Sequence, residues 1–408
     1  MKILWLSHLV PYPPKGGVLQ RSYNLLREVS KDHEVYLLAF VQSELIQRMF
    51  PDLARGKEEA LAALQSFCSR VQFIPIPSEE KLYGKYRLAI RSLFTWEPYA
   101  INWLKSELMC RVVQEWQNEF HFDVIHFDTI SLVPYIRYFK NTKSVLDHHN
   151  IESHMMLRRT VLEDNWLKKF YFYQEGLKLR EYEKRTCFMF DRHITCSYLD
   201  SERLREIDNS LSVEEIPNGV DVVYFSPMNT PELPRSLVFA GGLSWYPNQK
   251  AMLFFAQKVW PLLKHQFPDV NMDIVGQNPP KALLELAADD NSFRVHGFVD
   301  DVRPYLDRAA IYICPISDGG GTKLKILDAL AMGKAIIADP IACEGIEVEN
   351  GKNVLFAASA EEYVENIKRL FENPNLRKTL GISARQLVIE RYAFSNIGKK
   401  LSCIYESL

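Results

Sequence analysis

Short apolar runs alternate along the chain with segments whose apolar residues recur at helical spacing. In the first half, a stripe at Leu19, Tyr23, Leu26 and Val29 predicts a helix between the first two runs. Strands that are separated by helices pair in parallel, so this half predicts a doubly wound α/β sheet. The expected strands are 2–7, 35–40, 71–76, 123–127, 144–146 and 192–196.

The same alternation restarts after a turn at 217–221 and a Pro-rich stretch at 227–234. We therefore expect two Rossmann-like α/β domains that face each other across a cleft, since ligands bind outside the carboxyl ends of parallel strands. The first domain comprises 1–215 plus a C-terminal helix at 391–408 that crosses back, and the second comprises 216–390. The second domain's strands are expected at 236–240, 270–275, 293–296, 310–314, 335–338 and 354–356.

A run of three glycines, 319–321, lies between an apolar strand and a helical segment that starts near Leu324. Free amides and the positive end of a helix dipole at such a junction favour an anion. Lys323 and Lys325 add positive charge, and Asp328 could accept hydrogen bonds from ribose hydroxyls. The pattern matches neither the P-loop nor the dinucleotide fingerprint, and a simple connecting turn is the open alternative.

Composition narrows the class of protein. The 408 residues carry a net charge of −2, whereas a dedicated nucleic-acid-binding domain is usually basic. Seven cysteines form no C-x-x-C pair, which suits reduced thiols in a cytoplasm. Because no stretch of about 18 apolar residues could span a bilayer, we expect a cytoplasmic protein, peripheral at most at the inner face of the plasma membrane.

Five short motifs occur in a fixed order: Ile216–Asp221, Phe239–Gly242, Ile274–Gly276, His296–Asp301 and the triple-glycine segment. Together they carry a family resemblance. The chain resembles a family-4 retaining glycosyltransferase of the GT-B class. The block 245–280 is similar to a bacterial subgroup of exopolysaccharide and cell-envelope sugar transferases. This resemblance implies an acceptor-binding first domain and a second domain that binds a nucleotide-sugar donor.

The resemblance also implies a donor-binding set. The family's Glu-x7-Glu pair falls on Gly320 and Asp328, so the first carboxylate is missing and the second would hold the ribose. Phe298 and Val299 fall where relatives hold the base. The donor-binding residues implied are Gly16, Gly17, Gly241, Gly242, Gly276, Phe298, Val299, Gly320, Gly321, Thr322, Lys323, Lys325 and Asp328.

In the first domain the resemblance points to Asp128, His149 and Glu152 as catalytic residues that orient the acceptor or the sugar. Alternatives stay open: Asp128 could cap a helix over 130–137, and the pair His148-His149 could belong to the core. No D-x-D motif and no metal-spaced His/Cys set occurs, so we expect no metal and no cofactor besides the donor.

Two segments, 81–96 and 166–173, mix basic and aromatic residues. They could dock on anionic lipid or hold a lipid-linked acceptor. The alternative is a pair of helices that pack their aromatic residues inward.

The resulting hypothesis is a metal-independent hexosyltransferase. It would use a nucleoside-diphosphate sugar, with UDP favoured and GDP-mannose a rival, and a glycan, lipid-linked or small-molecule acceptor in polysaccharide or glycoconjugate synthesis. No nucleic acid is expected as a partner. The alternatives are a nucleotide-sugar-binding partner without transferase activity and a nucleotide-sugar epimerase of the same fold.

Overall fold

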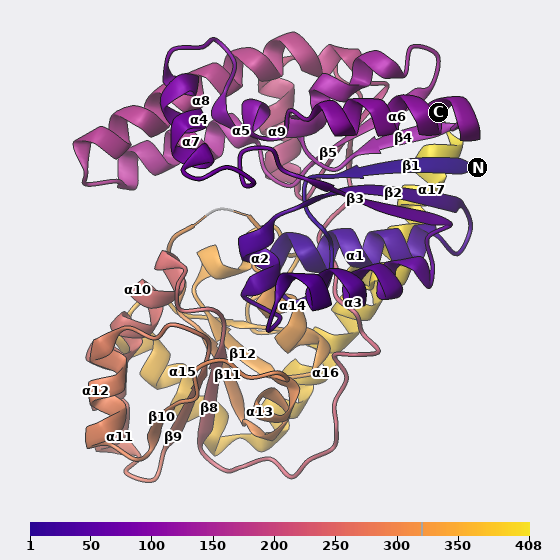
Figure 1. Ribbon diagram of the computed structural model, residues 1–408. Helices are drawn as coiled ribbons and strands as arrows, with labels where there is room; N and C mark the ends of the chain where they lie inside the picture. Colours follow the sequence, from indigo (N-terminus) through magenta and orange to yellow (C-terminus); the bar gives the residue numbers. More distant parts are fainter. Residues whose placement is uncertain (320) are drawn as a thin grey trace. The chain divides into compact units, whose positions relative to one another are not determined.

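The computed structural model describes residues 1–319 and 321–408, apart from the side chain of Leu162. The chain divides into two compact units, each built on its own parallel sheet (Figure 1). Unit 1 comprises Met1–Pro217 and Ile397–Leu408, and unit 2 comprises Asn218–Asn396. The α/β class and the doubly wound sheets expected from the sequence are confirmed.

Unit 1 is organised around a seven-stranded sheet with the order β3-β2-β1-β4-β5-β6-β7, in which every neighbouring pair is parallel. The order reverses between β1 and β4, which makes the carboxyl ends of these two strands the switch point of the sheet. Its strands are β1 (Lys2–Ser7), β2 (Glu34–Val41), β3 (Arg70–Pro75), β4 (Val124–Phe127), β5 (Lys143–His148), β6 (Arg192–Thr195) and β7 (Val213–Glu215).

The helices of unit 1 start at short polar caps where the sequence offers them. Asp52, Ser106 and Asn165 each accept a backbone N–H at the start of α3, α6 and α8. The helices are α1 (Gly17–Val29), α2 (Ser43–Gln47), α3 (Leu53–Gln65), α4 (Gly84–Leu93), α5 (Tyr99–Trp103), α6 (Glu107–Phe120), α7 (Glu152–Leu162), α8 (Trp166–Thr186), η2 (Cys187–Met189) and α9 (Tyr198–Ile207).

Two expected helices differ from the prediction. The segment predicted as a helix over 130–137 is a 3-10 helix, η1 (Ile130–Tyr138), because Pro134 lies inside it and cannot donate an α-helical hydrogen bond. The helix expected over 391–408 begins at Phe394 as α17 (Phe394–Glu406). The Tyr405 hydroxyl in α17 lies 2.8 Å from His126 Nδ1 on β4, so the end of the chain packs in unit 1.

Unit 2 has a six-stranded parallel sheet with the order β10-β9-β8-β11-β12-β13, which reverses between β8 and β11. A buried apolar cluster surrounds it and includes all of β11 and every residue of β8 except Ser236. Its strands are β8 (Ser236–Ala240), β9 (Asn271–Val275), β10 (Phe293–Val295), β11 (Ile311–Cys314), β12 (Ala335–Ala338) and β13 (Leu355–Phe356).

The helical stretch between β8 and β9 is a composite of α10 (Tyr246–Phe254), a π-helical turn η3 (Phe255–Val259) and α11 (Trp260–Gln266). Pro261 follows the π turn and supplies no N–H to the ladder. The remaining helices are α12 (Lys281–Asp289), α13 (Arg303–Arg308), α14 (Leu324–Ala331), η4 (Pro340–Cys343), α15 (Ala360–Glu372) and α16 (Pro374–Arg391). Among the described helices, none is both long and apolar enough to cross a membrane.

A buried carboxyl in α8 makes the stability of unit 1 depend on pH. Glu183 accepts the Ser153 N–H at 3.1 Å and the Ser153 hydroxyl, and burial raises the pKa of Glu183 to about 7. Because the folded pKa lies above the ordinary value of 4.5, Glu183 stabilises the fold most below pH 4.5. That contribution is lost as the pH rises through 7.

Glu183→Gln removes this titration and keeps a side chain that can hydrogen-bond Ser153. Its stability relative to the parent should therefore rise with pH, by on the order of 1–3 kcal/mol between the two pKa values. Urea unfolding of both proteins at a series of pH values measures this. Parallel stability curves would show that Glu183 does not titrate in this range.

Candidate functional site

The glycine turns predicted to bind the donor meet at one edge of the unit 2 sheet. Gly241 and Gly242 follow β8 directly, Gly276 follows β9, and the segment 315–323 follows β11. Because β8 and β11 flank the point where the strand order reverses, these turns surround the switch point at which open α/β sheets bind ligands.

Close backbone packing explains two of these glycines. A Cβ on Gly276 would lie 2.0 Å from the Gly241 carbonyl oxygen, so only glycine fits there. The Gly241 N–H donates to the Val275 carbonyl and the Gly276 N–H to the Gly297 carbonyl, each at 2.8 Å. These two amides are thus engaged within the sheet edge, and the contact of Gly241 and Gly276 with a donor stays a prediction.

Lys325, near the start of α14, reaches into this edge. Its Nζ donates to Asn248 Oδ1 at 2.7 Å and lies 5.0 Å from the Trp245 ring centroid and 5.9 Å from that of Phe239. A Cβ on Gly241 would lie 2.9 Å from Lys325 Cε, so this glycine leaves the room that the lysine occupies. Burial lowers the pKa of Lys325, although Cys314 and Asp328 oppose the shift.

The ammonium of Lys325 therefore has an amide and two aromatic faces beside it but no carboxylate within ion-pair distance among the described residues. A partly desolvated cation in such surroundings favours an anionic ligand. Asn248 is buried and fixes the lysine, because its Nδ2 also donates to the Gly242 carbonyl at 2.7 Å.

Trp245 and Asn248 are site residues that the sequence prediction omitted. Trp245 also packs on the glycine-rich segment, where a Cβ on Gly319 would lie 3.2 Å from its ring and 3.1 Å from Pro247. The sequence feature that could have identified Trp245 and Asn248 is their position directly after the Gly241-Gly242 turn, at the start of α10.

The other residues of the glycine-rich segment differ in what they contact. Lys323 is buried, and its Nζ donates to the carbonyls of Gly319 at 2.7 Å and Gly321 at 2.8 Å, so it braces the loop. The Thr322 hydroxyl is buried and has no hydrogen-bond partner within the described part of the chain. Gly320, predicted to supply an amide, lies outside the described residues.

The residues expected at the ribose and the base lie on α14 and after β10. Asp328 is three residues beyond Lys325, which places both on one side of the helix. Phe298 follows β10 and is exposed, whereas Val299 packs against the unit 2 core. Both roles stay predictions.

In unit 1, the predicted glycine pair forms the N-terminus of α1. Gly16 has φ 92° and Gly17 has φ 22°, both in the left-handed region that favours glycine. Cβ atoms built on them would meet nothing within 4 Å, so a ligand could approach this helix N-terminus closely.

Asp128 lies at the end of β4 and is fully buried. It accepts hydrogen bonds from the hydroxyls of Ser7 at 2.9 Å and Ser22 at 3.1 Å, and His149 Nε2 lies 3.0 Å from its Oδ1. His8 Nδ1 lies 3.4 Å from Oδ2. Thr129, not Asp128, occupies the N-cap position of η1, so the structure does not support the capping alternative.

Charge pairing sets the protonation of this cluster. Burial alone would raise the pKa of Asp128, but His149 and His8 hold it well below its ordinary value. Burial would likewise lower the pKa of His149, yet the Asp128 carboxylate raises it well above. The two residues form an ion pair at the carboxyl ends of β4 and β5. Glu152, the first residue of α7, has its pKa raised to about 6 by burial and can exchange a proton near neutral pH.

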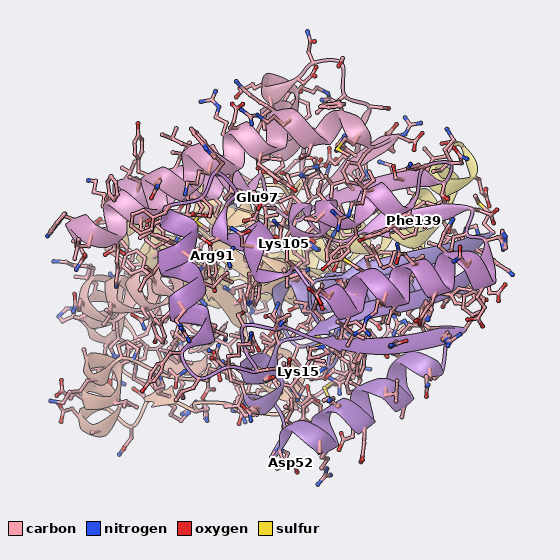
Figure 2. The ribbon with its side chains drawn as sticks, turned by 45° about the horizontal axis from the view of Figure 1, so that its top comes forward. Lys15, Asp52, Arg91, Glu97, Lys105 and Phe139 are labelled. Atoms are coloured by element: carbon pink, nitrogen blue, oxygen red, sulfur yellow. The ribbon has the colours of Figure 1, made fainter. Side chains whose placement is uncertain are left out.

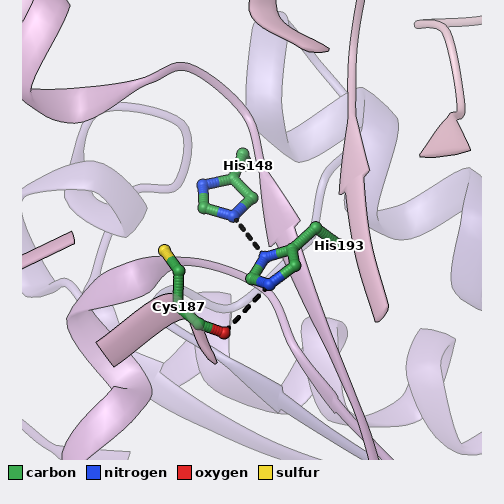
Figure 3. A group of neighbouring side chains, drawn as sticks. All are labelled: His148, Cys187 and His193. Carbon is green, nitrogen blue, oxygen red and sulfur yellow. Dashed lines mark hydrogen bonds between the residues drawn. The ribbon is translucent and has the colours of Figure 1, made fainter. Parts of the chain in front are cut away.

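Two histidines close in sequence to the Asp128 cluster belong to the core: His126, two residues before Asp128, and His148, directly before His149. His148 Nε2 lies 3.0 Å from His193 Nδ1, and His193 Nε2 lies 3.0 Å from the Cys187 carbonyl oxygen (Figure 3). His126 stacks on Trp5 with ring centroids 3.5 Å apart, and burial lowers its pKa to about 3. The side chains of His126 and His148 are both buried, and both stabilise the sheet next to the Asp128 cluster.

Arg21 is a second residue that the sequence prediction omitted. It is buried on α1 and donates to both Asp147 oxygens at 3.1–3.2 Å, and to the carbonyls of Ile216 and Pro217. Arg21 therefore joins α1 to the end of β5 and to the end of the Met1–Pro217 segment. These contacts fix the elements that surround Asp128.

The fold brings together residues of metal-ligating types that are far apart in the sequence. Two such groups are His8, Asp128 and His149, and His148, Cys187 and His193, with ligand atoms within 4.8 Å of one another. The side chains of Asp128, His149, His148 and His193 make the hydrogen bonds described above, whereas His8 Nδ1 has no hydrogen-bond partner within the described part of the chain. The expectation that the protein uses no metal stays a prediction.

A known family matches part of the chain that lies within unit 2. Residues 234–373 match the family described as glycosyl transferases group 1. The chain carries a glycosyl transferases group 1 domain. This domain includes every strand of unit 2 and the site around Lys325.

Similar proteins and similar solved structures are consistent with a glycosyl transferases group 1 domain. The chain is 22% identical to an uncharacterized 44.6 kDa protein in the cps region of Klebsiella pneumoniae, over 98% of this chain and 99% of that protein. It is 28% identical over 203 residues to a phosphatidyl-myo-inositol mannosyltransferase of Mycolicibacterium smegmatis, over 48% of this chain and 52% of that protein.

Among solved structures, sucrose-phosphate synthase from Thermosynechococcus elongatus has a TM-score of 0.71 at 14% identity and covers 100% of this chain and 99% of its own. Anabaena HepE in complex with UDP has a TM-score of 0.66 at 15% identity and covers both chains completely. These neighbours show that the group 1 domain and unit 1 together have the GT-B fold predicted from the sequence.

Proposed function

We propose that this glycosyltransferase transfers a hexose from a nucleoside-diphosphate sugar, with UDP favoured, to a hydroxyl acceptor with retention of configuration. The observation that carries the proposal is Lys325, a partly desolvated cation without a carboxylate partner at the switch point of the unit 2 sheet. Support for UDP comes from the fold neighbours, whose solved complexes contain UDP and UDP-glucose.

The site supports a mechanism based on positioning and charge. Lys325, the Thr322 hydroxyl and the amides of the glycine-rich segment would stabilise the departing diphosphate. The acceptor hydroxyl would attack from the side that the diphosphate leaves, and its proton would pass to a phosphate oxygen. Asp328 would hold the ribose, while Asp128, His149 and Glu152 would orient the sugar or the acceptor. No enzyme nucleophile is required.

The acceptor is proposed only by class: a hydroxyl of a glycan, a lipid-linked sugar or a small molecule. The relative in the cps region supports a role in polysaccharide synthesis. GDP-mannose is a rival donor, since another relative is a mannosyltransferase.

Thermal unfolding in the presence of UDP, UDP-glucose, GDP and GDP-mannose tests the donor. A nucleotide that binds the folded chain stabilises it by about 2.7 kcal/mol at a hundredfold excess over Kd. We expect the largest shift of Tm with the UDP compounds. If Tm rose only with GDP and GDP-mannose, the donor would be a GDP-sugar instead. If Tm rose with none of the four compounds, the proposal would be contradicted.

Product analysis separates the proposal from its alternatives. Incubated with the donor that binds, the enzyme should slowly release nucleoside diphosphate even without acceptor, through transfer to water. An epimerase would instead convert one nucleotide sugar into another with the diphosphate intact. A non-catalytic binding partner would leave the donor unchanged.

We also propose that the reaction needs no metal, because lysine and amide groups would take the place of a divalent cation at the diphosphate. Donor hydrolysis should therefore proceed at the same rate in the presence of EDTA. Loss of the activity in EDTA, with recovery on adding Mg²⁺ or Mn²⁺, would contradict this part of the proposal.

A further inference from the structure

Unit 1 exposes two apolar stripes to solvent. In and beside α4, the side chains of Tyr83, Tyr86, Ile90 and Phe94 recur at helical spacing and are 60–86% exposed. This spacing normally marks the buried face of a helix, but here the face is turned outward. The alternative that these aromatic residues pack inward is therefore wrong for α4. Leu82 and Trp96, at either end, are 82% and 92% exposed.

The second stripe lies on α8. Trp166, Phe170, Tyr173 and Leu177 follow the same spacing and are 45–73% exposed, while Glu175, Gly176 and Leu179 on the same helix are buried. An inward-facing arrangement is thus wrong for Trp166, Phe170 and Tyr173, whereas Tyr171 and Phe172 in the same segment are partly buried. Single exposed apolar residues are ordinary on a surface, but two complete helical stripes of them mark an interaction surface.

The two stripes belong to neighbouring elements of one unit. Lys178 Nζ donates to the carbonyls of Ser92 and Leu93, and Gln174 donates to Leu93 at 2.9 Å, which ties α8 to the end of α4. Figure 1 shows α4, α7 and α8 together, and Figure 2 labels Arg91 on α4 and the ion-paired residues Glu97 and Lys105. We call the residues 82–96 and 166–177 the aromatic surface.

The charges on the aromatic surface have one sign in excess. Lys85 is paired with Glu44 at 2.8 Å and Glu79 at 3.2 Å, and Glu97 is paired with Lys105. Four further cations are exposed and make no ion pair within the described part of the chain: Arg87, Arg91, Lys168 and Lys169.

We propose that the aromatic surface binds an anionic lipid bilayer, with the aromatic side chains in the acyl boundary and the four cations at the headgroups. Apolar stripes flanked by Lys and Arg are the combination that lies in a membrane interface, and Trp and Tyr prefer that zone. A protein partner of mixed charge would not require an excess of cations. Binding to the bilayer requires no sugar transfer, so it can be tested independently of the proposed function.

Flotation of the full-length chain with vesicles tests the proposal. The chain should float with vesicles of equal parts phosphatidylglycerol and phosphatidylcholine, much less with phosphatidylcholine alone, and less as salt is added. Emission of the exposed Trp96 and Trp166 should shift to shorter wavelength on binding. Equal binding to both vesicles, or no binding to either, would overturn the proposal.

Variants assign the binding to this surface. Removing one cation, as in Arg91→Gln, should reduce partition about fivefold, and Phe94→Ser with Trp96→Ser should reduce it at least about tenfold. Val223→Ser, an 83% exposed apolar residue in unit 2, is the matched control and should float like the parent. UDP binding by each variant reports on the fold and on the donor site. Undiminished flotation of the α4 variants would overturn the assignment.

Discussion

Replacing Lys325 with methionine is expected to weaken UDP binding about ten- to a hundredfold, since a hydrogen bond to a charged group contributes about 1.5–3 kcal/mol. Methionine keeps much of the length and the apolar stem that packs against Gly241, but it removes the ammonium near Asn248, Trp245 and Phe239. Isothermal titration calorimetry with UDP measures the change.

Lys368→Met is the matched control, because Lys368 is exposed on α15 and should not affect UDP binding. Lys323→Met separates charge from loop geometry, since that lysine holds the carbonyls of Gly319 and Gly321. We expect its loss of affinity to accompany a change in the loop. An unchanged Kd in Lys325→Met would remove Lys325 from the diphosphate site.

The second large effect is on stability. Arg21→Met should lower the free energy of unfolding by about 3–5 kcal/mol, because it leaves the buried Asp147 carboxylate and two backbone carbonyls without their donor. Burial already raises the pKa of Asp147 despite Arg21, so the variant should also become more stable, relative to the parent, as the pH falls. Urea unfolding at several pH values measures both effects.

The double variant Arg21→Met with Asp147→Asn should recover part of the loss, since the uncompensated charge is then gone. Arg180→Met, on the exposed part of α8, is the control and should cost little. If Arg21→Met lowered the free energy of unfolding by less than about 1 kcal/mol, the buried Arg21–Asp147 ion pair would not be what holds the elements of unit 1 together.

The sequence was sufficient for every strand except β7 because apolar strands and helical stripes are local patterns. The three residues of β7, Val213–Glu215, include two glutamates and form no apolar run. Where local rules compete, the prediction was less accurate, since Pro134 changes the helix expected over 130–137 to a 3-10 helix. The outward-facing aromatic residues of α4 have the spacing of a buried stripe, so periodicity could not say which side faces solvent.

The site was predictable only in part for a similar reason. The glycine turns and Lys325 lie in short motifs, which a sequence displays directly. Asn248 is 77 residues from the lysine it contacts, and Arg21 is 126 residues from Asp147. Such pairs come together only when the strands are placed in order, so neither their partners nor their geometry follows from local pattern.

The central claim is that the carboxyl edge of the unit 2 sheet holds the donor diphosphate. A crystal structure of the full-length chain soaked with UDP tests this most directly. We predict the diphosphate beside Lys325 Nζ and Thr322 Oγ1, with the ribose hydroxyls at Asp328. A diphosphate bound elsewhere, with Lys325 still held only by Asn248, would contradict the account.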